Sequence, residues 1–212
     1  PSFNYNDKAF DAAAWGTGTR ELGTRDSAAV YVSEFVSPDK KLKLSVETRV
    51  WTDFPVVELR PSLETAGDAQ TEFVDGFRAV ALRALPGDVR CVNVRTVTGS
   101  KTTYTDFIRR DVQLIGRHQS DSLVLSTAEG RSAADWLPYF GIDFAENEGL
   151  EVAIGWTGNW TSSFRYDGKT FTLDSGLTRA HFKMQPGEKF GMPSMLVYTR
   201  HAQTRRAGAV AF

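Results

Sequence analysis

Hydrophobic and polar residues alternate along most of this chain with the period of two that is typical of β-strands. The alternation is clearest between residues 41 and 50, where lysine, serine, glutamate and arginine occupy the odd positions. Apolar or β-branched residues occupy the even positions, which are Leu42, Leu44, Val46, Thr48 and Val50. Because such a segment buries one face and exposes the other, it predicts a half-buried strand of an antiparallel sheet.

Short runs of turn-forming residues separate further segments of this kind. Asp167-Gly168 stands between two alternating aromatic runs, which is a strong signal for a β-hairpin. Proline, glycine and aspartate mark other turns at 37–39, 66–68, 86–88 and 185–188. The expected strands include 29–36, 41–50, 56–61, 72–85, 89–97, 123–125, 151–154, 161–166, 169–173, 177–184 and 195–198. With about twelve short strands and almost no helix, the pattern predicts an all-β fold of two packed antiparallel sheets.

Two segments near the N-terminus depart from this pattern. Asn6 or Asp7 is a suitable cap for one short helix that runs through Trp15 and is closed by Gly16. Residues 20–27 are polar and contain one glycine, so we expect a loop there.

The chain shows no linker and no internal repeat, so residues 1–200 are expected to form a single β-sandwich domain. We expect residues 201–212 to form a tail or a truncated linker, because Arg205-Arg206 is followed by small apolar residues that could begin a helix. The chain opens on Pro1 without an initiator Met, which indicates a processed chain or an excised part of a longer one.

The stretch from Trp136 to Trp160 is the most aromatic part of the chain and holds three of its five tryptophans. Gly155 and Gly158 allow tight turns, so we expect Trp156 and Trp160 to project from a rim. Two interpretations remain open. The tryptophans form core or a contact between domains, or they face a sugar, since an indole combines a large apolar face with one polar group.

Composition removes several classes of function. The net charge of −1 gives no basic field for nucleic acid. No apolar run approaches the length of a membrane span, so we expect a soluble protein with no membrane partner, in the cytoplasm or exported. The single Cys91 excludes an internal disulfide, and we interpret it as a buried structural thiol.

Candidate chemistry is sparse, and we predict no catalytic residue, no metal and no cofactor. The three histidines, His118, His181 and His201, are not spaced as metal ligands, and no nucleophile-elbow, Walker or dinucleotide motif is present. The acidic residues Asp143, Glu146, Glu148 and Glu151 are expected to lie together in a solvated loop.

Asp53 is more distinctive, because it lies between Trp51 and Phe54 where a strand is expected to break. A carboxylate there can accept hydrogen bonds from backbone N–H groups or from sugar hydroxyls, and we favour the structural turn.

Several segments together resemble the N-terminal β-sandwich domain of glycoside hydrolase family 36 α-galactosidases and their melibiase-like relatives. Trp51-Thr52-Asp53-Phe54-Pro55-Val56-Val57-Glu58 is similar to the family's "Y-x-D-F/Y-P-x-x-E" segment. Residues 155–160 resemble its "W-S/T-G-N/Q-W" run, and 185–188 resembles "L-x-P-G-E". Further matches keep the family's order and span nearly the whole chain: 3–5, 10–15, 63–67, 130–132, 137–140 and 175–177.

The resemblance implies a β-supersandwich of the galactose-mutarotase-like kind, which in that family precedes a (β/α)₈ barrel with two catalytic aspartates. No segment here matches the barrel's motifs. The resemblance therefore implies a noncatalytic N-terminal domain that supports a catalytic barrel of the same gene product, contributes to homo-oligomer contacts and helps to hold a galactoside. The positions that it suggests for substrate binding or domain contact are Asp53, Trp136, Trp156, Asn159 and Trp160.

Three alternatives remain. An independent carbohydrate-binding module would use the same tryptophans. A small mutarotase-like enzyme would need a His base with a carboxylate, and His118 and His181 lack that motif context. A purely structural domain would bury its tryptophans. If the domain is separated from a barrel, we expect one large apolar surface patch that includes Trp156 or Trp160 and part of the tail.

Overall fold

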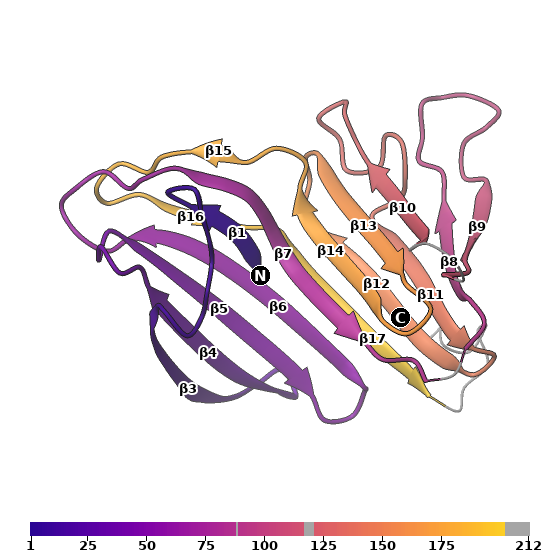
Figure 1. The fold of residues 1–212 in the computed structure, drawn as a ribbon, viewed down its shortest axis with the longest axis horizontal. Helices are drawn as coiled ribbons and strands as arrows, with labels where there is room; N and C mark the ends of the chain where they lie inside the picture. Colours follow the sequence, from indigo (N-terminus) through magenta and orange to yellow (C-terminus); the bar gives the residue numbers. More distant parts are fainter. Residues whose placement is uncertain (88, 117–120, 202–212) are drawn as a thin grey trace.

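The computed structural model describes residues 1–87, 89–116 and 121–201, and in them it shows two antiparallel β-sheets and no helix. Figure 1 shows that the long strands of both sheets run in roughly the same diagonal direction. The predicted all-β fold with two packed sheets is confirmed.

The smaller sheet has seven strands in the order β10-β13-β14-β7-β1-β2, with β15 paired to β7. Its strands are β1 (Ser2–Tyr5), β2 (Lys8–Ala9), β7 (Val74–Ala84), β10 (Asp121–Ser126), β13 (Trp160–Tyr166), β14 (Phe171–Leu177) and β15 (His181–Phe182).

The larger sheet has ten strands in the order β3-β4-β5-β6-β17-β12-β11-β8-β9, with β16 paired to β6. Its strands are β3 (Gly16–Arg25), β4 (Ala28–Val36), β5 (Leu42–Trp51), β6 (Val56–Thr65), β8 (Val92–Val97), β9 (Arg109–Leu114), β11 (Tyr139–Ala145), β12 (Glu148–Gly155), β16 (Lys189–Gly191) and β17 (Ser194–His201).

The hydrophobic core lies between the two sheets. Leu42 and Leu44 are fully buried, as the alternation in β5 predicted, and they belong to the same core cluster as Phe77, Phe164 and Phe171 of the smaller sheet. Full burial of a leucine or phenylalanine side chain contributes about 1.5–3 kcal/mol. The apolar positions of the alternating strands therefore supply the force that holds the layers together.

The predicted N-terminal helix is wrong. Asn6 and Asp7 both have a positive φ, of 51° and 59°, and form the tight turn of a β-hairpin in which Tyr5 pairs with Lys8. The ring of Phe10 stacks on that of Phe3 with centroids 5.0 Å apart, in an aromatic cluster that closes this corner of the core. A helix of so few residues is marginal by itself, so packing of the aromatic rings decides the conformation.

The loop predicted for residues 20–27 is also wrong over most of its length, because β3 extends from Gly16 to Arg25. β3 is the edge strand of the larger sheet and most of its residues are exposed. It therefore lacks the hydrophobic alternation by which the other strands are recognised. Its register shifts between Glu21 and Gly23, where Gly23 has a φ of 89°.

Two further predictions need adjustment, and parts of two others are untested. In β7, Phe77 and Ala79 are buried as expected, but Val80 is buried and Ala81 exposed, because a register shift against β14 interrupts the alternation. The strand expected at 177–184 is reduced to β15. Residue 88 of one predicted turn and residues 202–212 of the predicted tail lie outside the described residues.

Candidate functional site

The tryptophan-rich end of the molecule is built around the loop that joins β10 to β11. Trp160 is 0% exposed, and its Nε1 donates to the carbonyl oxygen of Ser132 at 2.7 Å. Asn159 accepts a hydrogen bond from the backbone N–H of Gly130 at 2.6 Å. Asn159 and Trp160 therefore fix this loop, and Trp160 is a core residue.

Trp136 and Trp156 are partly buried and pack against the core at the same end. Trp136 bridges to Thr98, which begins the loop between β8 and β9. The indole of Trp156 lies over Gly158, where an added Cβ would be 3.1 Å from Nε1. Four of the five residues predicted for substrate or domain contact are thus gathered at one end of the sandwich.

Asp53 lies at the opposite end of the larger sheet. The N–H of Thr199, near the end of β17, donates to Pro55 at 2.9 Å, whereas Ser194 at the start of β17 pairs with Gly155. The eight residues of β17 span about 23 Å, at about 3.3 Å per residue. The structure therefore does not bring Asp53 together with Trp156.

Of the two tryptophans expected in an apolar surface patch, Trp160 is buried and Trp156 is partly exposed. The patch at Trp156 therefore stays a prediction, and its tail part lies outside the described residues. Exposed aromatic side chains lie at both ends of the sandwich, because the β8–β9 loop is hydrogen-bonded to the loop that carries Trp136, whereas Phe54 lies at the far end. Tyr104 and Phe107 are 97% and 62% exposed on the β8–β9 loop, and Phe54 is 56% exposed beside Asp53.

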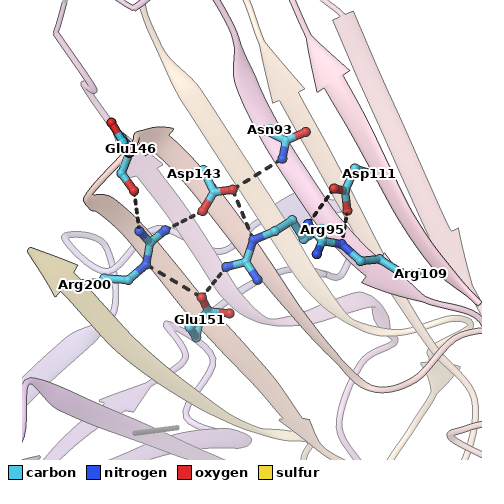
Figure 2. Close-up of polar contacts among 8 residues, drawn as sticks. All are labelled: Asn93, Arg95, Arg109, Asp111, Asp143, Glu146, Glu151 and Arg200. Atoms are coloured by element: carbon cyan, nitrogen blue, oxygen red, sulfur yellow. Dashed lines mark hydrogen bonds and ion pairs between the residues drawn. The ribbon is translucent and has the colours of Figure 1, made fainter. Parts of the chain in front are cut away.

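A network of buried charges occupies the other face of the larger sheet, where it crosses β8, β11, β12 and β17 (Figure 2). Arg95 donates from Nε to Asp143 at 3.1 Å and from Nη2 to Glu151. Arg200 donates from Nη2 to the other oxygen of Asp143, and from Nη1 to the carbonyl oxygen of Glu146 at 3.2 Å. Two guanidinium groups and two carboxylates thus balance in charge.

The solvated loop predicted for the acidic residues is wrong for Asp143 and Glu151, which lie on β11 and β12 and are 3% and 6% exposed. The positive charges of Arg95 and Arg200 compensate the burial of these two carboxylates. Burial by itself would lower the pKa of Arg95, but the negative charges of Glu151 and Asp143 outweigh it and hold that pKa above its usual value.

Two glycines make room for the network. Gly141 stands opposite Arg95 across β11 and β8, and a Cβ on it would come within 2.2 Å of Arg95 Nη2. Gly149 plays the same part for Arg200, opposite which it lies on β12. The sequence does contain a signal for this network, because each of two strands carries a glycine directly opposite an arginine of the neighbouring strand. The signal can be recognised only when the pairing of the strands is known.

A cavity of about 190 Å³ opens beside the network. The residues lining it come from β8, β9, β11 and β12: Arg95, Thr96, Val97, Arg109, Tyr139, Phe140, Gly141 and Glu151. Tyr139 is 47% exposed, and Arg109 is held by a bidentate ion pair with Asp111 at 2.9 and 2.6 Å. The cavity combines an aromatic ring with several charged groups that already have partners.

The described residues hold no group of three or more His, Cys, Asp or Glu side chains that could bind a metal ion. His181 contacts Asp75 and stacks on Phe73, and His118 lies outside the described residues. In the same described ranges, no helix is long and apolar enough to cross a membrane.

No protein-family model and no curated protein matches this sequence. Solved structures do match. The α-galactosidase AgaA of glycoside hydrolase family 36 from Geobacillus stearothermophilus, in complex with raffinose, matches 98% of this chain with 13% identity and a TM-score of 0.70. The α-galactosidase from Lactobacillus brevis matches 88% with 11% identity and a TM-score of 0.68.

This chain covers only 30% and 26% of those two enzymes. The Slr1438 protein from Synechocystis differs in this respect: it matches 93% of this chain at 11% identity and a TM-score of 0.55, and 73% of its own length is covered. The predicted resemblance to family 36 α-galactosidases is confirmed at the level of the fold. The chain folds like a part that makes up less than a third of those enzymes.

Proposed function

We propose that this chain is the noncatalytic N-terminal domain of an α-galactosidase-like glycoside hydrolase. The observation that carries the proposal is the asymmetry of coverage, since 98% of this chain corresponds to 30% of an α-galactosidase. A fold that accounts for so small a share of an enzyme leaves the remainder to a catalytic domain of the same gene product.

The geometry supports a role for the Asp53 loop in contact with that domain. β17 ends at His201, beside the Pro55 end of this loop, so the polypeptide leaves the described sandwich on the same side. Phe54 presents an exposed ring there, and aromatic side chains are enriched in interfaces. Asp53 is then placed to contact the barrel or a galactoside bound to it.

The tryptophan-rich end serves a second contact in this proposal. Trp136, Trp156 and Asn159 lie away from the Asp53 loop, where they would meet another subunit of a homo-oligomer, and Trp160 fixes the loop beneath them. The chain by itself is inactive, because a glycosidase needs two carboxyl groups that flank a sugar. The buried carboxylates of Asp143 and Glu151 are instead engaged by Arg95 and Arg200.

An independent carbohydrate-binding sandwich is the second candidate. The Slr1438 protein favours it, because a chain of which 73% corresponds to this fold leaves little length for a catalytic barrel. This candidate differs from the first in one measurable respect, since it requires a natural gene product without a catalytic domain.

The test compares the natural full-length gene product with the 212-residue chain in hydrolysis of a chromogenic α-galactoside. We expect a product several hundred residues longer that is active, a 212-residue chain that is inactive, and loss of activity when residues 1–201 are deleted from the full product. A natural product that ends near Phe212 would refute the accessory-domain proposal. Saturable binding of a galactoside by that short product would then establish the second candidate.

A further inference from the structure

We propose that the cavity between Tyr139, Arg109 and Glu151 binds one ring of a neutral sugar on the open face of the larger sheet. The inference does not depend on the proposed function, because the whole site lies within this chain. It also differs from the predicted contact residues, none of which lines this cavity.

The size of the cavity suits a single six-membered ring. Its volume is about 190 Å³, and a protein cavity of about 150 Å³ takes up a benzene molecule. Gly141 helps to create the space, since a Cβ at this position would approach both Arg95 and Glu151. A longer oligosaccharide would have to extend over the rim.

The polar groups suit hydroxyls. Oε1 of Glu151 accepts from Arg95, and among the described residues no hydrogen bond reaches its Oε2, which lies beside Gly141 in the cavity lining. A carboxylate oxygen accepts hydrogen bonds from sugar hydroxyls, and the guanidinium of Arg109 on the far wall donates to them. Donor and acceptor thus stand on opposite sides of one ring-sized space.

The aromatic wall suits the apolar face of a pyranose. Tyr139 is the exposed aromatic residue of the lining, and its odd position on β11 places it on the same face as Gly141 and Asp143. A phenol ring offers a flat apolar surface with one polar end, on which the C–H face of a pyranose can stack. Val97 of β8 also lines the cavity and extends the apolar wall.

Charge balance selects a neutral ligand over an anion. Arg95 is neutralised by Asp143 and Glu151, and Arg109 by its bidentate pair with Asp111 (Figure 2). A phosphate or carboxylate ligand would meet the charge of Glu151 without an unpaired guanidinium to compensate. Neutral hydroxyls carry no such penalty.

The test is a titration of the 212-residue chain with methyl α-galactoside, methyl α-glucoside and inorganic phosphate, followed by the backbone amide signals of residues 139–141 in NMR spectra. We expect saturable shifts with at least one neutral glycoside, in roughly the millimolar range that a single ring supports, and none with phosphate. Tyr139→Ala should weaken binding by about tenfold or more, whereas Tyr139→Phe keeps the ring and retains binding.

Tyr104→Ala is the matched control, because it removes a more exposed tyrosine outside the cavity and should leave the affinity unchanged. Three results would overturn the proposal: no saturable binding of either glycoside, equal affinity of the wild type and Tyr139→Ala, or tighter binding of phosphate than of the glycosides. None of these results depends on whether a catalytic barrel follows this chain.

Discussion

Gly141 lies directly opposite Arg95 across two neighbouring strands, so close that a Cβ on the glycine would come within 2.2 Å of the guanidinium. The absent side chain is what allows Arg95 to lie flat across the sheet and reach Glu151. Position 141 therefore requires glycine because of the neighbouring Arg95 side chain, and not because of its backbone conformation.

This relationship predicts the effect of Gly141→Ala. The new methyl group displaces Arg95 and leaves the nearly buried carboxylate of Glu151 with only its longer contact to Arg200, at 3.8 Å. Breaking a buried ion pair costs about 3–5 kcal/mol, and we expect a loss of about 2–4 kcal/mol because the arginine can shift partway. Urea denaturation measures it. Gly18→Ala, where nothing lies within 4 Å of the new Cβ, should change stability by less than about 0.5 kcal/mol.

Replacing Arg200, the second arginine of the network, should lower the stability of the protein by a similar amount. Its side chain is 0% exposed and contacts the side chain of Asp143, which is itself buried. Arg200→Ala should lower the free energy of unfolding by about 3–5 kcal/mol, because the carboxylate of Asp143 stays buried with less compensation.

The control for Arg200 is Arg131→Ala, which removes an exposed pair with Glu129 and should cost about 0–1 kcal/mol. Equal midpoints of urea unfolding for the two variants would contradict a structural role for the network.

Alanine substitutions of Trp160 and Trp156 should differ in their effect on the free energy of unfolding, as measured by urea denaturation. Trp160→Ala removes a fully buried indole and its hydrogen bond to Ser132, so we expect a cost of about 3–5 kcal/mol. Trp156→Ala should cost clearly less, because its indole is only partly buried. If Trp156→Ala proved the more damaging substitution, the assignment of Trp160 as the core residue would be wrong.

The stability of the loop between β8 and β9 should depend on pH through the carboxyl group of Asp106. Its pKa is lowered to about 2, above all by the backbone N–H of Lys101, with Ser100 and Thr103 contributing. Because the folded pKa lies below the ordinary value of 3.8, the stabilisation is fully present above about pH 4 and is lost as the pH falls through about 2.

NMR titration of the Lys101 and Thr103 amides checks this prediction. Both signals should titrate with a midpoint near pH 2, and Asp106→Asn should abolish the step. A midpoint near pH 4 in the wild-type protein would show that the folded loop does not favour the carboxylate.

The sequence determined the two-sheet architecture because burial of alternating side chains is a local, repeated requirement. The even positions of 41–50, the Asp167-Gly168 turn and the Pro-Gly turn at 185–188 each specify a strand or its end without reference to the rest of the chain. Segments whose conformation depends on distant partners were misread. The Asn6–Trp15 segment follows its aromatic contacts, and β3 takes its conformation from pairing with β4.

The candidate site was decided by the tertiary structure alone. The sequence placed Asp143 and Glu151 close together, but only the strand register sets them against Arg95 and Arg200, which lie about fifty residues away along the chain. The same register put Asp53 at the far end of β17 from Trp156. Alternation along a strand determines which face of the sheet a side chain occupies. The order and pairing of the strands determine which side chains contact one another. A charged side chain can be buried only where this pairing places an opposite charge beside it.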